Sequence, residues 1–99
     1  MPLVVDSAGN EIRALRKATQ WKGKRVLEVG CGDGRLTLRL AAFGPRRIEA
    51  LDPGIQRIRL ARKSRPARYS GRISYHVGSS DRLRYHNRLF DVVVFSWAL

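Results

Sequence analysis

The 99-residue sequence has a single cysteine, Cys31, and it lacks any run of about 18 apolar residues. A lone cysteine excludes a disulfide within the chain. The missing apolar run excludes a membrane-spanning helix, and the N-terminus shows no signal-peptide pattern of charged, apolar and small residues. From these absences we expect a cytoplasmic protein with no membrane partner.

Histidines and acidic residues are also scarce. The two histidines, His76 and His86, lie in polar stretches and share no metal-ligand spacing with Cys31, so no metal site is predicted. Only 8 acidic residues stand against 20 Lys and Arg, which gives a formal net charge of +12. This excess attracts polyanions such as nucleic acid. The basic residues are nevertheless scattered from Arg13 to Arg88, and a general preference for arginine explains much of the excess.

Short β-branched runs alternate with helical patterns in a chain long enough for one small domain. Strands are predicted at 25–29, 47–52, 72–77 and 90–96, and helices at 11–21, 36–42 and 54–63. In the last helix, Ile55, Ile58 and Ala61 are expected to face inward. Residues 2–10 read as a short apolar lead followed by turn and cap residues. The alternation predicts an α/β fold with a parallel sheet, right-handed crossovers and helices on both faces.

Three closely spaced glycines follow the first of these strands. Gly30, Gly32 and Gly34 can adopt positive φ, bring backbone amides close to a ligand and lead into a helix whose N-terminus favours negative charge. A ligand that resembles a nucleotide or carries a carboxylate is implied. The dinucleotide fingerprint G-x-G-x-x-G needs glycine at position 35, where this chain has Arg35. A dehydrogenase half-domain is therefore a weaker alternative, which a test with NAD can check.

The segment 26–34 resembles motif I of the class I S-adenosylmethionine-dependent methyltransferases, of the methyltransferase type 11/25-like kind. Three later segments agree in order: 48–54 is similar to the family's second strand with its terminal acid, 77–83 to its adenine segment and 90–96 to its fourth strand. The resemblance covers roughly residues 20–99. It implies a Rossmann-like parallel sheet whose first four strands lie in the order 3-2-1-4. It also implies S-adenosyl-L-methionine as cofactor and methyl transfer to an acceptor that the sequence does not identify.

The resemblance assigns cofactor contacts to residues at the ends of these strands. It implies that the backbone around Gly30, Cys31 and Gly32 cradles the methionine moiety, and that Glu28 lies near its ammonium, directly or through water. Asp52, 24 residues after Glu28, is implied to accept hydrogen bonds from the ribose hydroxyls. Asp52 also suits an ordinary helix cap, and both roles can hold. Cys31 is expected to fill the loop and not to act as a nucleophile.

The adenine end of the cofactor is assigned to residues after the second and third strands. In this scheme Pro53 packs on the adenine face, and Ser79, Ser80 and Asp81 offer amides and oxygens to the adenine edge. The family often has aspartate where Ser79 stands, so Ser79 and Asp81 stay alternatives for the contact with the exocyclic amine. Ser96, at the end of the fourth strand, completes the predicted cofactor-binding set. No catalytic residue is assigned, because a sulfonium is already activated and alignment of the reacting atoms can supply several kcal/mol.

The predicted domain ends after its fourth strand. We expect a helical lead over residues 1–22 and, over 23–99, a partial cofactor-binding domain without the segments that build the acceptor site. In that arrangement residues 92–95 form part of an exposed edge strand that is apolar on both faces, which favours self-association. We therefore expect a fragment of a longer enzyme that is marginal as an enzyme on its own.

A basic nucleic-acid-binding module, or a portion of an RNA methyltransferase, is the alternative function. No acidic residue lies between Asp52 and Asp81, and helical spacing can set Arg59, Arg62 and Lys63 on one exposed face. A solvated helix face is favoured over a nucleic-acid partner for this stretch. Steep salt dependence of binding separates the two functions, because contacts to phosphates weaken with added salt.

Overall fold

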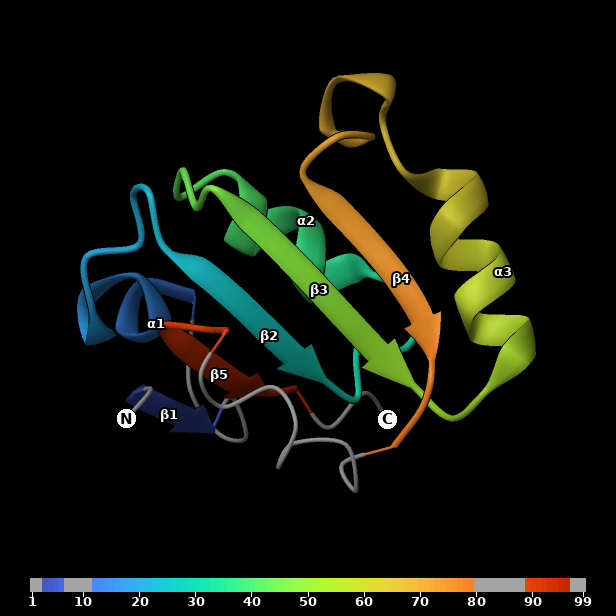
Figure 1. The fold of residues 1–99 in the computed structure, drawn as a ribbon, viewed down its shortest axis with the longest axis horizontal. Helices are drawn as coiled ribbons and strands as arrows, with labels where there is room; N and C mark the ends of the chain where they lie inside the picture. Colours follow the sequence, from blue (N-terminus) through green and yellow to red (C-terminus); the bar gives the residue numbers. More distant parts are fainter. Residues whose placement is uncertain (1–2, 7–11, 80–88, 97–99) are drawn as a thin grey trace.

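The computed structural model describes residues 3–6, 12–79 and 89–96, and the strands among them form one parallel sheet (Figure 1). The four predicted strands are present as β2 (Arg25–Val29), β3 (Arg47–Asp52), β4 (Ile73–Val77) and β5 (Val92–Phe95). They lie in the spatial order β4-β3-β2-β5, which is the predicted order 3-2-1-4, and all their pairings are parallel. The expected α/β fold with a parallel sheet is confirmed.

A further strand, β1 (Leu3–Asp6), pairs with β5 on its far side. The two strands run parallel, with Leu3 opposite Val92 and Asp6 opposite Phe95. The expectation that residues 92–95 form an exposed edge is therefore wrong, because the segment read as an apolar lead supplies a partner strand. β5 is held between β1 and β2, and Val93 in its middle is only 2% exposed. Self-association stays a prediction, but the exposed edge on which it was based is absent among the described strands, because β1 pairs with β5.

The boundary expected at residue 22 also stays a prediction, although β1 belongs to the same sheet as the later strands.

The helices among the described residues lie between the strands along the chain. They are α1 (Ile12–Ala18), α2 (Arg35–Ala41) and α3 (Ile55–Ser64), followed by a 3-10 turn, η1 (Ala67–Tyr69). Trp21 was predicted inside α1 but lies beyond its end, buried, with its Nε1 donating to the carbonyl of Leu15 at 2.9 Å. In α3 the predicted inward position of Ile55 is wrong, since that side chain is 51% exposed. None of the described helices is long and apolar enough to cross a membrane.

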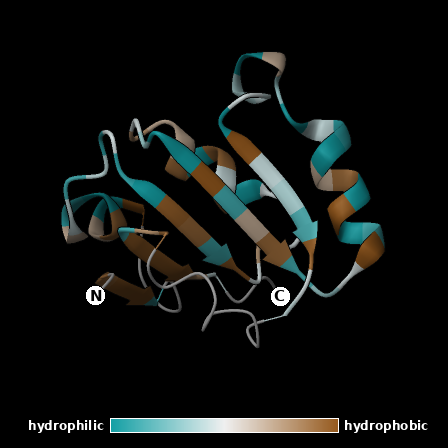
Figure 2. Cartoon of the chain, in the orientation of Figure 1, coloured by the Kyte–Doolittle hydropathy of each residue, from teal (hydrophilic) through white to brown (hydrophobic). Residues whose placement is uncertain are grey.

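The two faces of the sheet carry separate hydrophobic clusters, because successive side chains of a strand point to opposite faces. In β2, Val26 belongs to the larger cluster and Leu27 to the smaller one. The larger cluster receives Leu40 from α2 and Ile58 from α3. The smaller cluster consists of residues from strands and from the start of the β5 segment: Leu27, Val29, Leu51, Phe90 and Val93. No described helix contributes to it, so the expected cover of helices on both faces stays a prediction. Figure 2 shows hydrophobic colour along β1, β2 and β5 and hydrophilic colour where β2 and β3 begin.

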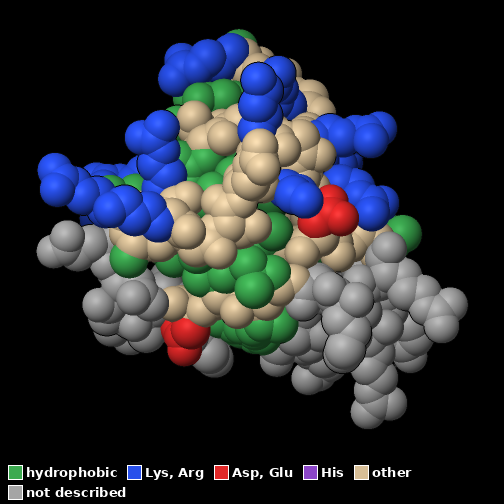
Figure 3. Space-filling view, turned by 90° about the vertical axis from the view of Figure 1, so that its left-hand side faces the viewer, with side chains coloured by type: hydrophobic (Ala, Val, Ile, Leu, Met, Phe, Trp, Pro, Cys, Tyr) green, Lys and Arg blue, Asp and Glu red, His purple; other side chains and the backbone are tan. Residues whose placement is uncertain are grey.

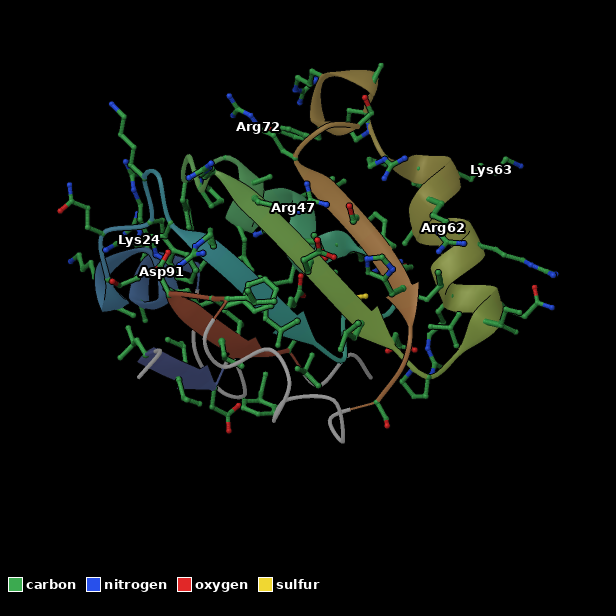
Figure 4. The ribbon with its side chains drawn as sticks, in the orientation of Figure 1. Lys24, Arg47, Arg62, Lys63, Arg72 and Asp91 are labelled. Carbon is green, nitrogen blue, oxygen red and sulfur yellow. The ribbon has the colours of Figure 1, made fainter. Side chains whose placement is uncertain are left out.

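β4 lies at the other edge of the sheet, next to α3. Two arginines near the end of α3 reach this edge: Arg62 donates from Nη2 to the carbonyl of Tyr75 at 2.7 Å, and Arg65 donates from Nη1 to the carbonyl of Ile73 at 2.7 Å. These carbonyls are two residues apart, so both point to the same side of the strand, away from β3. The basic helix face expected from the sequence is thus divided, because Arg62 binds the backbone of β4 (Figure 4).

Candidate functional site

The loop after β2 is tied to the end of β3 by its backbone. The amides of Gly30 and Cys31 both donate to the carbonyl of Leu51, at 2.8 and 3.0 Å. Gly30 and Gly32 have φ of 81° and 58°, in the left-handed region that glycine adopts at no steric cost. The loop therefore folds back over the carboxyl ends of β2 and β3, which is where ligands bind in parallel α/β sheets.

Asp52, the last residue of β3, binds this loop directly. Its Oδ1 accepts the amide of Gly32 at 3.1 Å, and its Oδ2 accepts the amide of Gly54 at 2.9 Å and Nε of Arg57 at 2.8 Å. Burial by itself raises the pKa of Asp52, but the hydrogen bonds from Gly54, Arg57 and Gly32 outweigh it and hold the pKa below its usual range. The predicted carboxylate is thus ionised and lies beside the predicted glycine loop.

Glu28 lies in β2, beneath the loop, and is completely buried. Its Oε1 accepts the hydroxyl of Thr37 and its Oε2 accepts the hydroxyl of Ser96, both at 2.5 Å. Burial raises the pKa of Glu28, and the two hydroxyl hydrogen bonds offset this only in part. Ser96 lines the cleft described below, so this side chain connects the buried carboxyl with the ligand space.

Gly34 caps the N-terminus of α2 and lies against the same buried group of polar side chains. Its φ is 90°, and a Cβ at this position would come within 2.5 Å of the hydroxyl oxygen of Tyr75. Burial raises the pKa of Tyr75 to about 12, so its hydroxyl keeps its proton at neutral pH. The third glycine of the motif is therefore needed both for its backbone conformation and for space.

A cleft of about 380 Å³ opens beside the loop. It is lined by residues from the loop, from α2, from α3 and from the end of β5: Cys31, Gly32, Asp33, Arg35, Leu36, Arg57, Leu60 and Ser96. This volume lies within the range of about 300 to 1,000 Å³ that is common for small-molecule sites. The cleft is consequently large enough to hold much of a nucleoside.

A larger cavity of about 490 Å³ lies on the other face of the sheet, where Leu27, Leu51 and Phe90 form its apolar wall. Its polar side holds His76, whose Nε2 lies 2.6 Å from Oε2 of Glu49. The glycine loop does not line this cavity. Because loop amides and the Asp52 carboxylate suit a nucleoside better than an apolar wall does, we take the smaller cleft as the candidate site.

The predicted contacts fall into several groups. Cys31, Gly32 and Ser96 line the cleft, and Asp52 lies next to it through its bonds to Gly32 and Arg57. Gly30 lies in the part of the loop that is hydrogen-bonded to Leu51, and the buried Glu28 precedes it in β2.

The residues predicted to contact the adenine are not among those that line the cleft. Pro53 and Ser79 are exposed and do not line it. The amide of Gly78 donates to the carbonyl of Asp52 at 3.1 Å, which brings the segment after β4 to this end of the sheet. Ser80 and Asp81 lie outside the described residues.

The surroundings of Cys31 disfavour nucleophilic chemistry at its thiol. Cys31 is buried, and this burial, together with the charges of Glu28 and Asp52, raises the pKa of its thiol. A protonated thiol is a poor nucleophile, which agrees with its predicted role as loop filler. No group of three or more metal-ligating side chains occurs among the described residues.

Sequence reasoning missed three participants in this site: Arg57, Thr37 and Tyr75. Thr37 left a signal, since it is a polar residue three positions before Leu40 on the buried face of α2. Arg57 and Tyr75 left none, because their contacts depend on how elements distant in the sequence are placed.

The comparison with protein families gives a match to the methyltransferase domain over residues 26–99. Among curated proteins, the ubiquinone biosynthesis O-methyltransferase of Azorhizobium caulinodans is 33% identical over 92 residues, which covers 93% of this chain and 34% of that protein.

Among solved structures, a putative type II methyltransferase from Anaeromyxobacter dehalogenans superposes with a TM-score of 0.63 at 31% identity, covering 85% of this chain and 32% of that one. An S-adenosylmethionine-dependent methyltransferase from Mesorhizobium loti gives a TM-score of 0.58 at 25% identity, over 69% of this chain and 29% of that one. The chain thus spans about a third of the length of the curated relative it matches. The family match covers most of the chain, and the predicted strands, glycine loop and acid occur in the predicted order. The chain belongs to the methyltransferase-domain family of class I S-adenosylmethionine-dependent methyltransferases.

Proposed function

We propose that this chain binds S-adenosylmethionine in the cleft beside the glycine loop and forms the cofactor-binding part of a methyltransferase. The observation that carries the proposal is the 3.1 Å hydrogen bond between the Gly32 amide and Oδ1 of Asp52. It places the loop and the strand-end carboxylate at one site, so that a single adenosine-bearing ligand can reach both.

The residues at the cleft fit the polar groups of this cofactor. Asp52 offers an ionised carboxylate for the ribose hydroxyls, and a carboxylate acceptor gives the stronger, charge-assisted kind of hydrogen bond. Gly30 and Gly32 carry no side chain of their own, and Gly32 lines the cleft, which leaves room for the methionine portion. Glu28 reaches the cleft through the Ser96 hydroxyl, so we assign to Ser96 the ammonium contact that the family resemblance implies for Glu28, with Glu28 as its hydrogen-bond partner.

The cofactor, when bound, supplies an activated methyl group on a positively charged sulfur. The chain's own residues bind and orient this group, and alignment with an acceptor is enough to provide much of the rate. Asp52 is a weak general base, because its hydrogen bonds, including the one from Arg57, hold its pKa below the usual range, and Cys31 keeps its proton because burial raises the pKa of its thiol. The acceptor is left open by this proposal.

Calorimetric titration of the purified chain with S-adenosylhomocysteine tests the proposal. We expect saturable binding to the wild type and a loss of roughly tenfold or more in Asp52→Asn, since a charge-assisted hydrogen bond contributes about 1.5–3 kcal/mol. Glu49→Gln is the matched control, because it removes one charge from the same strand on the wall of the other cavity. Thermal melts of both variants establish that they fold.

Three outcomes contradict the proposal: no binding to the folded wild type, equal affinity in Asp52→Asn, or an equal loss in Glu49→Gln. Titration with NAD tests the dehydrogenase alternative. Arg35 disfavours that alternative, because the dinucleotide fingerprint has glycine at this position. NAD binding tighter than that of S-adenosylhomocysteine favours that alternative and refutes ours.

A further inference from the structure

The amino ends of β2, β3 and β4 lie side by side, at the opposite end of the sheet from the glycine loop (Figure 1). Arg25 is opposite Arg47 in the register of β2 and β3, and the amide of Arg46 donates to the carbonyl of Lys24 at 2.8 Å. The amide of Ile48 donates to the carbonyl of Arg72 at 2.7 Å, which brings the start of β4 beside the start of β3. Basic residues that lie far apart in the sequence therefore meet at one end of the molecule.

We call these residues the amino-end surface: Lys22, Lys24, Arg25, Arg46, Arg47 and Arg72. Two carboxylates accompany the six cations. Asp91 pairs with Arg25 at 3.5 Å, and Glu49 pairs with Arg47 at 2.7 Å. The side chains of Lys22, Arg46 and Arg72 are exposed and form no ion pair with the described residues. Figure 3 faces this side of the molecule and shows Lys and Arg over its upper part with little red among them.

The surface keeps a local excess of positive charge after these pairings. Asp91 is already held by Arg25, whose backbone amide and guanidinium keep the pKa of Asp91 below its usual range, with a smaller contribution from Lys24. Figure 4 shows Lys24 and Asp91 near the start of β2, and Arg47 and Arg72 further along the same end of the sheet. An incoming anion therefore meets cations spread across three neighbouring strands, whose axes are spaced about 4.8 Å apart.

We propose that the amino-end surface binds the phosphate backbone of a nucleic acid. Most of its cations are arginines, whose planar guanidinium groups match phosphate oxygens with two parallel hydrogen bonds. The nearby aromatic ring of Phe43 packs on Trp21 with ring centres 5.6 Å apart, so it is not free to stack on a base. Contact is therefore to phosphates, and binding is independent of base sequence.

An anionic lipid surface is the other polyanion to consider, and the composition of the surface disfavours it. Membrane-surface binding usually combines basic residues with apolar side chains that enter the lipid. None of the large exposed hydrophobic side chains of the described structure lies on β2, on β3 or at the start of β4: Ile55 and Leu60 lie on α3, Val77 ends β4, and Leu3, Val4 and Leu89 lie at the border of the surface, where the amide of Leu3 donates to the carbonyl of Asp91. The strands that carry the six cations therefore present charge with no large exposed apolar side chain among them.

This inference goes beyond the cofactor site, since the two lie at opposite ends of the strands. It also differs from the helix face that the sequence suggested, because Arg62 of that face is bound to the carbonyl of Tyr75. Arg59 and Lys63 remain exposed on α3 and make no ion pair with the described residues, so they provide a matched comparison.

The test is fluorescence anisotropy of a labelled single-stranded RNA of mixed sequence with the full chain over a range of salt. Neutralising about three phosphates predicts a slope of about −2 for the logarithm of affinity against the logarithm of salt concentration. We expect the double variant Arg46→Glu and Arg72→Glu to lose at least about tenfold in affinity, as the loss of several phosphate contacts predicts. The control, Arg59→Glu with Lys63→Glu, changes the net charge equally and should lose less than about threefold, through long-range attraction alone. Circular dichroism establishes that both fold.

Equal losses in the two double variants overturn the inference, because net charge then explains binding without a specific surface. A larger loss in the α3 variant overturns it in favour of the helix face. Binding to phosphatidylserine vesicles that is tighter than binding to RNA, and that the Arg46 and Arg72 changes abolish, overturns it in favour of lipid. Saturating S-adenosylhomocysteine should leave RNA affinity unchanged, and direct competition contradicts the placement at the amino ends.

Discussion

Arg57 donates from Nε to Oδ2 of Asp52 at 2.8 Å, on an oxygen that also accepts the amide of Gly54 at 2.9 Å. A carboxylate oxygen has two lone pairs, so these two donors fill Oδ2, whereas Oδ1 accepts one described donor, the amide of Gly32. A ribose diol that bonds to both oxygens needs a free position on each. Arg57 therefore competes with the ribose for Asp52.

Replacing Arg57 with methionine keeps a long side chain and removes the donor. We predict that Arg57→Met binds S-adenosylhomocysteine about fivefold more tightly, since one hydrogen bond of about 1 kcal/mol no longer has to be displaced. Calorimetric titration measures the change, and Arg59→Met on the same helix is the control with no predicted effect. Weaker binding in Arg57→Met contradicts the competition, because it shows that Arg57 holds the ligand.

Gly54→Ala offers an independent route to the same state. A Cβ on Gly54 would come within 2.7 Å of the guanidinium of Arg57, so the flexible arginine has to move away. The backbone φ of −83° at Gly54 suits alanine. We predict that this variant also tightens binding. An unchanged affinity in a variant that has lost the Arg57–Asp52 contact, as seen in its structure, counts against the competition.

The buried Glu28 predicts that the chain loses stability as the pH rises above 4.5. Its pKa is raised above 4.5 in the folded chain, so the folded state holds this proton more tightly than the unfolded state. The associated stability is present below pH 4.5 and is lost as the pH rises through the folded pKa. Glu28→Gln cannot show this loss. As the pH rises, the free energy of unfolding of the wild type should therefore fall relative to that of the variant. Urea denaturation across this window measures the difference, and parallel curves contradict the prediction.

Asp52 predicts a pH dependence of stability that is opposite to that of Glu28 and occurs at lower pH. Its folded pKa lies below 3.8, so its contribution to stability is present above pH 3.8 and is lost as the pH falls through the folded value. Asp52→Asn should remove this acid-side loss while leaving the Glu28 effect in place. Urea denaturation between about pH 2 and pH 5 tests the sign, and a wild type and variant that lose stability equally on acidification contradict it.

Gly34→Ala tests the packing beneath the loop. The substitution places a methyl group 2.5 Å from the Tyr75 hydroxyl oxygen, on a backbone with φ of 90°. We predict a loss of about 2 kcal/mol or more, because steric conflict adds to the backbone strain of about 1 kcal/mol. Gly23→Ala is the control for strain alone, since its φ is 76° and nothing lies within 4 Å of the added carbon.

The Tyr75→Phe background separates the two costs of Gly34→Ala. Removing the hydroxyl takes away the closest contact, so Gly34→Ala should cost less in this background than in the wild type. Urea denaturation of the four chains gives the coupling energy. A coupling near zero contradicts the assigned contact.

Arg62 and Arg65 are expected to protect the outer edge of β4 from pairing with a strand of another chain. They donate to the carbonyls of Tyr75 and Ile73 on the outer side of β4, and exposed strand edges pair with other chains. We predict that Arg62→Leu with Arg65→Leu increases self-association in sedimentation experiments, whereas Arg59→Leu with Lys63→Leu, which removes the same charge, does not. Equal self-association of the two variants would assign the increase to added hydrophobic surface and contradict the protection of the β4 edge by Arg62 and Arg65.

Part of this site could be predicted from the sequence because it rests on local patterns. Gly30, Gly32 and Gly34 are closely spaced after a β-branched run, and Asp52 ends the next one, so parallel packing brings them to one edge of the sheet. The family resemblance supplied the strand order and the identity of the cofactor. The structure adds the direct bond between Gly32 and Asp52.

The remaining features depend on contacts that no short pattern encodes. β1 has only four residues, and Val4 is 59% exposed, so its alternation carries little of the signal of a buried strand. Its partner Val93 lies near the other end of the sequence. Arg57 and Arg62 share one helix, yet one bonds to a carboxylate and the other to a strand edge. Both read as solvated arginines until the strands beside the helix are placed.

The amide NMR spectrum of the isotope-labelled chain, recorded during titration with S-adenosylhomocysteine, tests the central claim most directly. If the cofactor lies between the glycine loop and Asp52, the largest shifts occur at the amides of Gly30, Gly32 and Gly54, and they are lost in Asp52→Asn. Shifts confined to the amino ends of the strands around Arg47 and Arg72, or a spectrum that does not change at saturating ligand, would contradict it.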